Sequence, residues 1–273
     1  MQPQLVDYLL YEKEPSGILW IRFNRPPQNA LLVPESLAAV ADYMRAGDHD
    51  PEVRVMVLTG APGRQFSAGV ELRRPPELVS PAPEREGPDA SRQRFIYDYY
   101  PHFHVISEEI MKPTIAMING AAVGMGMDLA LRCDIRMGCE NTRFFTYQNV
   151  GQIIENGGSY FLPRIAGLGR ALELAYTGGF LSGEDAYHWG ILNHYVPADQ
   201  LEAETRALCE KIINSPPLVQ WISKRIMRRA LDCNLWAVQD MCANASSILF
   251  AAEDSREARQ AFFEKRTPVY KGR

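Results

Sequence analysis

Short apolar runs alternate with helix-like segments through the first two-thirds of the chain. The residues with helical apolar spacing are 35–45, and residues 129–132 form the body of a short buried helix. The apolar runs have the length, the β-branched residues and the closing glycine or polar residue of strands. They are ILWIRFN (18–24), VRVMVLTG (53–60), PTIAMING (113–120) and DIRMGCE (134–140). This alternation predicts an α/β fold with parallel strands.

The pattern becomes helical after about residue 178. Ser182, followed three positions later by Asp185, is typical of a helix start. We therefore expect an α/β core over residues 1–197 and a helical region over residues 198–273. The helices predicted after residue 178 are 182–189, 198–214, 217–231, 235–251 and 255–263.

Composition narrows the function classes. The 273 residues are 46% hydrophobic and 23% charged, with a net charge of −4, which is typical of a globular protein and excludes a disordered chain. Without a basic excess, nucleic acid is not an expected partner. Because no apolar run approaches ~18 residues and no signal peptide is evident, we expect a cytoplasmic protein without a membrane partner.

Metal and disulfide chemistry is not indicated. The five cysteines are scattered without a CxxC pair, which fits reduced thiols. His102 and His104 would share one face of a strand, but packing explains them better than a metal pair. We therefore expect no metal site.

Two glycine-containing turns follow predicted strands. QFSAGVEL (65–72) follows the run that ends at Gly60, and INGAAVGMGMDLA (118–130) opens a helix. Small residues let a backbone approach a ligand closely, and a helix N-terminus directs N–H groups and partial positive charge at it. Either turn alone also fits plain tight packing. The second lacks the basic and hydroxyl residues of a phosphate-binding P-loop.

Taken in order, these and four further segments resemble the crotonase (enoyl-CoA hydratase/isomerase) superfamily over nearly the whole chain. The segment NRPPQNAL (24–31) is one residue shorter than the corresponding turn in that family. The segments are NRPPQNAL (24–31), FSAGVEL (66–72), NGAAVGMGMDLALRCDI (119–135), GGSYFLPRIAG (157–167), TGGFLSGEDAYHWGILNHYVP (177–197) and DSREARQAFFEKRTPVYKGR (254–273).

The resemblance implies a crotonase-like spiral of β-β-α turns with a helical C-terminal trimerisation region, assembled as a homotrimer or hexamer. It also implies that two backbone N–H groups, here those of Val70 and Met125, stabilise a thioester enolate. The expected partner is an acyl-CoA substrate, with no separate cofactor. The implied CoA contacts are Gln28, Ala30, Ala68, Leu72, Arg73, Arg74 and Lys271.

The acidic residues depart from the hydratase pattern. Hydratases hold a water between two glutamates, and the matching positions here are Asp128 and Tyr147. Tyrosine, with a pKa of about 10, does not readily replace a carboxylate base, although it can donate a proton or orient water. Glu155 matches the catalytic glutamate of the Δ3,Δ2-enoyl-CoA isomerases. The sequence thus favours an isomerase in which Glu155 carries the proton and Asp128 assists.

Other interpretations stay open. Asp128 and Glu155 together could hold a water, as a hydratase requires. Asp128 also fits a pair with Arg132 one helical turn later, and Glu155 fits a charge at the start of the helix predicted over 157–164. A C–C bond hydrolase acting on a cyclic β-diketone and a non-catalytic acyl-CoA-binding protein are the further alternatives. A dehalogenase is disfavoured, because it needs an aspartate nucleophile.

Overall fold

The computed structural model describes residues 3, 5–26, 35–71, 101–102, 104–146, 151–155 and 157–273. Within these residues the main sheet has six strands in the order β1-β2-β3-β4-β6-β9, and all neighbours are parallel except β1 and β2. A second sheet has the order β5-β7-β8. The strands are β1 (Leu9–Lys13), β2 (Ile18–Phe23), β3 (Val55–Gly60), β4 (Thr114–Ile118), β5 (Ala121–Val123), β6 (Ile135–Gly138), β7 (Arg143–Phe145), β8 (Phe180–Ser182) and β9 (His194–Tyr195).

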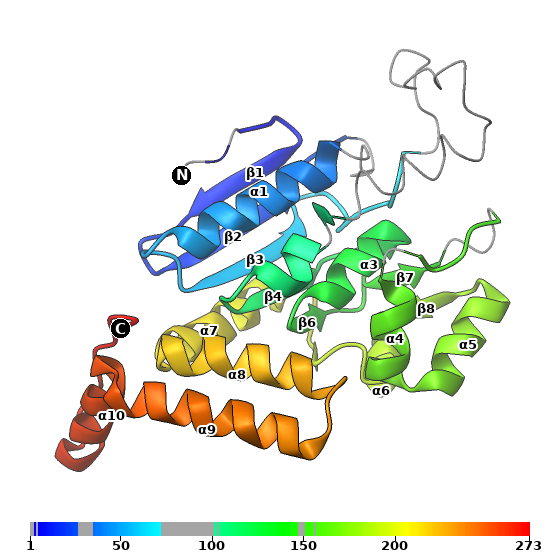
Figure 1. Ribbon diagram of the computed structural model, residues 1–273. Helices are drawn as coiled ribbons and strands as arrows, with labels where there is room; N and C mark the ends of the chain where they lie inside the picture. The colour runs from blue at the N-terminus through cyan, green and yellow to red at the C-terminus, as the bar shows by residue number, and fades with distance from the viewer. Residues whose placement is uncertain are drawn as a thin grey trace, which may run out of the picture.

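Helices cover both faces of the main sheet (Figure 1). Alternate residues of β2 point to opposite faces: Leu19 packs in the cluster that includes α1 and α3, whereas Trp20 packs in the cluster that includes α7. The helical elements are α1 (Glu35–His49), the π-helical turn η2 (Val105–Glu109), α3 (Met125–Arg132), α4 (Gly158–Ala166), α5 (Leu168–Thr177), α6 (Gly183–His188), α7 (Leu201–Ile213), α8 (Pro217–Ala230), α9 (Leu235–Ala251) and α10 (Glu253–Glu264).

This mixed α/β fold with a helical C-terminal region confirms the expected fold class. The predicted strands and helices are all present, with shifts of a few residues at their ends. Ser182 caps α6 by accepting a hydrogen bond from the Asp185 N–H, as its position predicted. The expectation missed β1, the very short strands β5, β7, β8 and β9, and helix α5.

Helix α1 continues four residues beyond its predicted end, through Gly47 to His49. Glycine usually weakens a helix interior. Here a Cβ at Gly47 would lie 2.9 Å from the sulfur of Met56 and would also clash with Leu19. Close packing of the helix on the sheet therefore accounts for this glycine.

Helix α8 joins the core mainly through ionic contacts, since Pro217 is its one buried residue. The Asp134 carboxylate lies 2.7 Å from both Lys224 Nζ and Arg228 Nη2. Arg228 also donates to the carbonyl oxygen of Arg132 at 3.0 Å, at the end of α3. Burial raises the pKa of Asp134, but the two cations outweigh burial and hold that pKa below its usual value.

We predict that Asp134→Asn destabilises the fold by about 2–3 kcal/mol at neutral pH, because it leaves two partly buried cations without a counter-charge. Since the pKa of Asp134 is lowered on folding, its contribution is present at neutral pH and is lost as the pH falls below about 4. Urea unfolding at several pH values should therefore show the difference between variant and wild type shrinking with acid. Asp232→Asn, which removes the exposed partner of Arg164, is the control and should change stability much less. A difference that persists undiminished at acidic pH would contradict this account.

Candidate active site

The turn after β3 pairs with the strand that leads into α3. The Ser67 N–H donates to the Ala121 carbonyl oxygen, and the Val123 N–H donates to the Ser67 carbonyl oxygen, each at 2.9 Å. These two bonds form a parallel bridge between Ser67 and Ala122. The two glycine-containing turns of the sequence therefore meet in space.

Glycine makes that close approach possible. A Cβ at Gly126, in the first turn of α3, would lie 2.7 Å from the Ser67 Cβ. Gly69 has a φ of +80°, and its N–H donates to the Ser67 hydroxyl at 3.1 Å, which turns the chain directly before Val70. Gly124, with a φ of +49°, turns the chain directly before Met125.

The two expected donors thus lie on adjoining turns. Met125 is the first residue of α3 and is buried, while Val70 is half-buried. The partial positive charge of a helix N-terminus favours an anionic ligand atom at that end of α3. The arrangement is suited to receive an oxygen that gains negative charge.

Asp128 lies one helical turn into α3 and is 1% exposed. Arg132, one turn further, is also buried. Its Nη1 donates to the Ser107 hydroxyl of η2 at 2.7 Å, and its guanidinium stacks 5.4 Å from the ring centre of Phe161. Burial lowers the pKa of Arg132 to about 10, against the opposing charges of Asp128 and Glu108. Asp128 and Arg132, four residues apart on α3, therefore interact electrostatically inside the protein, as their spacing predicted.

Glu155 is half-buried in the loop before α4. Gly157 follows with a φ of +99°, and its N–H donates to the Glu155 carbonyl oxygen at 2.7 Å. A Cβ at Gly157 would lie 2.9 Å from Cζ of Arg132, and a Cβ at Gly158 would clash with the Asp128 carboxylate. The loop that carries Glu155 therefore packs directly on the helix that carries Asp128.

The remaining expected site residues differ in where they lie. Ala68 is half-buried in the first turn. Lys271 follows α10, where its N–H donates to Asp254, and Figure 1 shows that end of the chain well away from α3. Outside the described residues lie Gln28, Ala30, Leu72, Arg73, Arg74 and Tyr147.

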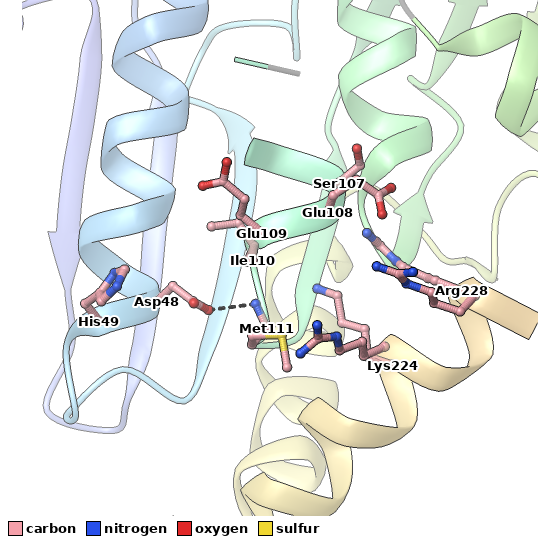
Figure 2. Close-up of a pocket in the computed structure, with 11 residues that line it drawn as sticks. Asp48, His49, Ser107, Glu108, Glu109, Ile110, Met111, Lys224 and Arg228 are labelled. Atoms are coloured by element: carbon pink, nitrogen blue, oxygen red, sulfur yellow. Dashed lines mark hydrogen bonds between the residues drawn. The ribbon is translucent and has the colours of Figure 1, made fainter. Parts of the chain in front are cut away.

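A pocket of about 510 Å³ lies beside η2 and α8 (Figure 2). Ser107, Glu108, Lys224 and Arg228 are among its lining residues. The pocket borders the Ser107–Arg132 contact but does not include the two turns.

His102 and His104 have helical backbone, not the strand geometry in which they would share a face. Within the described part of the chain, no group of three or more potential metal ligands comes together. In that same part, no helix has the length and apolar character needed to cross a bilayer.

Sequence comparison decides the family. The sequence model of the enoyl-CoA hydratase/isomerase family matches residues 13–273. The chain belongs to this family. It is therefore a crotonase-superfamily acyl-CoA enzyme, as the resemblance implied.

Individual relatives carry hydratase-type names. The chain is 34% identical over 265 residues to carnitinyl-CoA dehydratase of Salmonella typhi, covering 94% of this chain and 95% of that protein. Its structure is similar to that of enoyl-CoA hydratase from Bacillus anthracis, with a TM-score of 0.87, 28% identity and coverage of 98% and 100%. An enoyl-CoA hydratase subunit I structure from Geobacillus kaustophilus gives a TM-score of 0.85 at 30% identity, with coverage of 97% and 98%. These names do not support the preference for isomerase over hydratase.

Sequence reasoning missed the residues that join the loop to the helix. Ser107 and Phe161 contact Arg132 from distant parts of the chain. Ser107 lies outside the motif segments, and Phe161 lies inside GGSYFLPRIAG without a role that the motif assigns to it. The adjacent glycines Gly157 and Gly158, two and three residues after Glu155, were the available signal.

We predict that Met125→Pro removes the α3 donor while keeping the helix, because proline lacks an N–H but fits the first helical position. Turnover of an acyl-CoA substrate should fall roughly 10²–10³-fold. Met125→Ala, which shortens the side chain but keeps the N–H, is the matched control and should lose much less. Circular dichroism verifies the fold of both variants. Equal turnover by the two variants would show that the Met125 amide is not a donor.

Proposed function

We propose that this protein catalyses the reversible dehydration of a 3-hydroxyacyl-CoA to a 2-enoyl-CoA. The observation that carries the proposal is the junction of the two turns at the start of α3, with the Glu155 loop packed on the same helix. The names of the relatives favour dehydration or hydration as the reaction.

In the proposed reaction, Glu155 removes the proton from the α-carbon of the substrate. The electron pair moves into the thioester carbonyl, whose oxygen is then held by the Val70 and Met125 amides. Collapse of this enolate forms the α,β double bond and expels the β-hydroxyl. The hydroxyl takes up the proton that Glu155 removed and leaves as water, so that Glu155 is again a carboxylate. Hydration is the same sequence in reverse.

Glu155 suits the principal proton transfer better than Asp128 does. Asp128 is 1% exposed, on the same helix as the buried Arg132 that interacts with it, whereas Glu155 is half-buried in a loop. A proton carrier must reach the substrate at hydrogen-bond distance, so the more accessible carboxylate is favoured. Asp128 then assists, and Tyr147 is the proposed group for orienting the water.

Double-bond isomerisation is the second candidate function. The deep burial of Asp128 favours it, because moving a proton between two carbons of one enolate needs only one carboxylate. Incubating the enzyme with 2-enoyl- and 3-enoyl-CoA thioesters, and separating the products by mass and retention, distinguishes the two reactions. Hydration of the 2-enoyl-CoA raises its mass by one water, whereas isomerisation leaves the mass unchanged.

The substrate-binding proposals extend the same site. We assign the CoA moiety to Gln28, Ala30, Ala68, Leu72 and Arg73, and Lys271 is proposed to contact CoA on another copy of the chain. A homotrimer or hexamer is proposed for the assembly, since apolar side chains of α9 and α10 are largely exposed in the single chain. Among them are Trp236, Phe250, Phe262 and Phe263.

We predict that Glu155→Gln lowers turnover roughly 10²–10⁴-fold with little loss of CoA-thioester affinity, because glutamine keeps the size of the side chain but cannot take a proton. Asp128→Asn should lower isomerisation less than hydration, since only hydration needs a second group to manage water. Steady-state assays and calorimetric binding measure both effects. Near-normal activity of Glu155→Gln together with an inactive Asp128→Asn would reverse the two roles.

A further inference from the structure

We propose that Arg132 is a positioning residue that fixes the Glu155 loop against α3. This inference rests on the proposed role of Glu155 in the reaction. Arg132 touches neither the substrate nor the reacting atoms in this account. It acts through Gly157, which its guanidinium contacts, and through Asp128 on its own helix.

The Arg132 side chain is held from several directions. Its Nη1 donates to the Ser107 hydroxyl at 2.7 Å, the Phe161 ring lies against the guanidinium, and Asp128 supplies the opposing charge. In the backbone of the same residue, the Arg132 carbonyl oxygen accepts a hydrogen bond from Arg228 at 3.0 Å. Figure 2 shows Ser107 and Arg228 on the same side of the pocket. The position of the guanidinium is thus determined by α3, η2 and α4, whereas α8 holds the backbone of the same residue.

The loop is shaped to this side chain. A Cβ at Gly157 would lie 2.9 Å from Arg132 Cζ and still closer to its Nη2, and the φ of +99° is unfavourable for any other residue. At the next residue, Gly158, an added Cβ would clash with the Asp128 carboxylate. Two consecutive glycines therefore leave room for the Arg132 guanidinium and the Asp128 carboxylate. The hydrogen bond from the Gly157 N–H to the Glu155 carbonyl oxygen then links the backbone of Glu155 to this contact.

A planar guanidinium suits this place better than an ammonium group. It can stack on an aromatic ring while donating in its own plane, and it is more weakly hydrated, which lowers the cost of burial. A lysine at position 132 would keep the positive charge but not this combination of contacts. Lysine and methionine substitutions therefore separate the role of geometry from that of charge.

The experiment compares turnover and KM for Arg132→Met, Arg132→Lys and Gly157→Ala, with Arg164→Met as the matched control. Arg164 pairs with Asp232 on the surface of α4 and contacts neither glycine. Because a misplacement of about 1 Å in a reacting group can cost about 10²-fold, the three test variants should lose roughly 10–100-fold in kcat. Their KM for the CoA thioester should change less than about threefold, and the control should keep wild-type values.

The double variant Arg132→Met/Gly157→Ala gives the decisive readout. If both residues act by placing the same loop, their losses in kcat should not multiply, and the double variant should resemble the worse single variant. A general loss of packing would instead multiply the losses and raise KM. Ser107→Ala, which removes one hydrogen bond from Arg132, covers the case in which Arg132→Met does not fold, and it should lower kcat roughly three- to tenfold.

The two proposals fail in different ways. If Glu155→Gln abolishes turnover while Arg132→Met and Ser107→Ala retain it, the positioning role is wrong and the proposed function stands. If Glu155→Gln retains turnover, the role of Glu155 is wrong, and the positioning inference is overturned with it.

Discussion

The site depends on one close backbone contact, in which Ser67 pairs with the segment Ala121–Val123 and packs against Gly126. Two hydrogen bonds of 2.9 Å align the turns, and a side chain at Gly126 would leave no room for Ser67. Because parallel strands β3 and β4 are neighbours, the segments that follow them emerge at the same edge of the sheet. The sheet therefore brings the two proposed donors together before any side-chain chemistry is involved.

Helix α3 carries three residues of the proposed site within its eight residues. Its N-terminus carries the Met125 amide, its middle carries Asp128, and its last residue, Arg132, carries the charge that accompanies Asp128. The whole helix is buried, and its end is tied to α8 through the Arg228 contact with the Arg132 carbonyl oxygen. A rigid helix of this kind gives the proposed site one fixed support, both for the Met125 amide and for the Glu155 loop that packs on it.

The sequence predicted local features and motif positions well, but not the contacts between distant segments. The sequence located β2 because it is a continuous apolar run of strand length, and α9 because it is a 17-residue stretch without glycine or proline. Strands of two or three residues, such as β5 and β9, carry too few positions for any pattern and form only through their partners. In the proposed site, the two glycine-containing turns and both carboxylates were located from motifs. The contact of Gly157 with Arg132 was not, because it depends on the tertiary placement of α4 on α3.

The central claim is that the amides of Val70 and Met125 jointly hold the thioester oxygen of an acyl-CoA. A crystal structure of the enzyme with a saturated acyl-CoA, which cannot react, tests this most directly. We expect the thioester oxygen at about 2.7–3.1 Å from both amide nitrogens, with the α-carbon facing Glu155. A bound acyl-CoA whose thioester oxygen points away from both amides would contradict it.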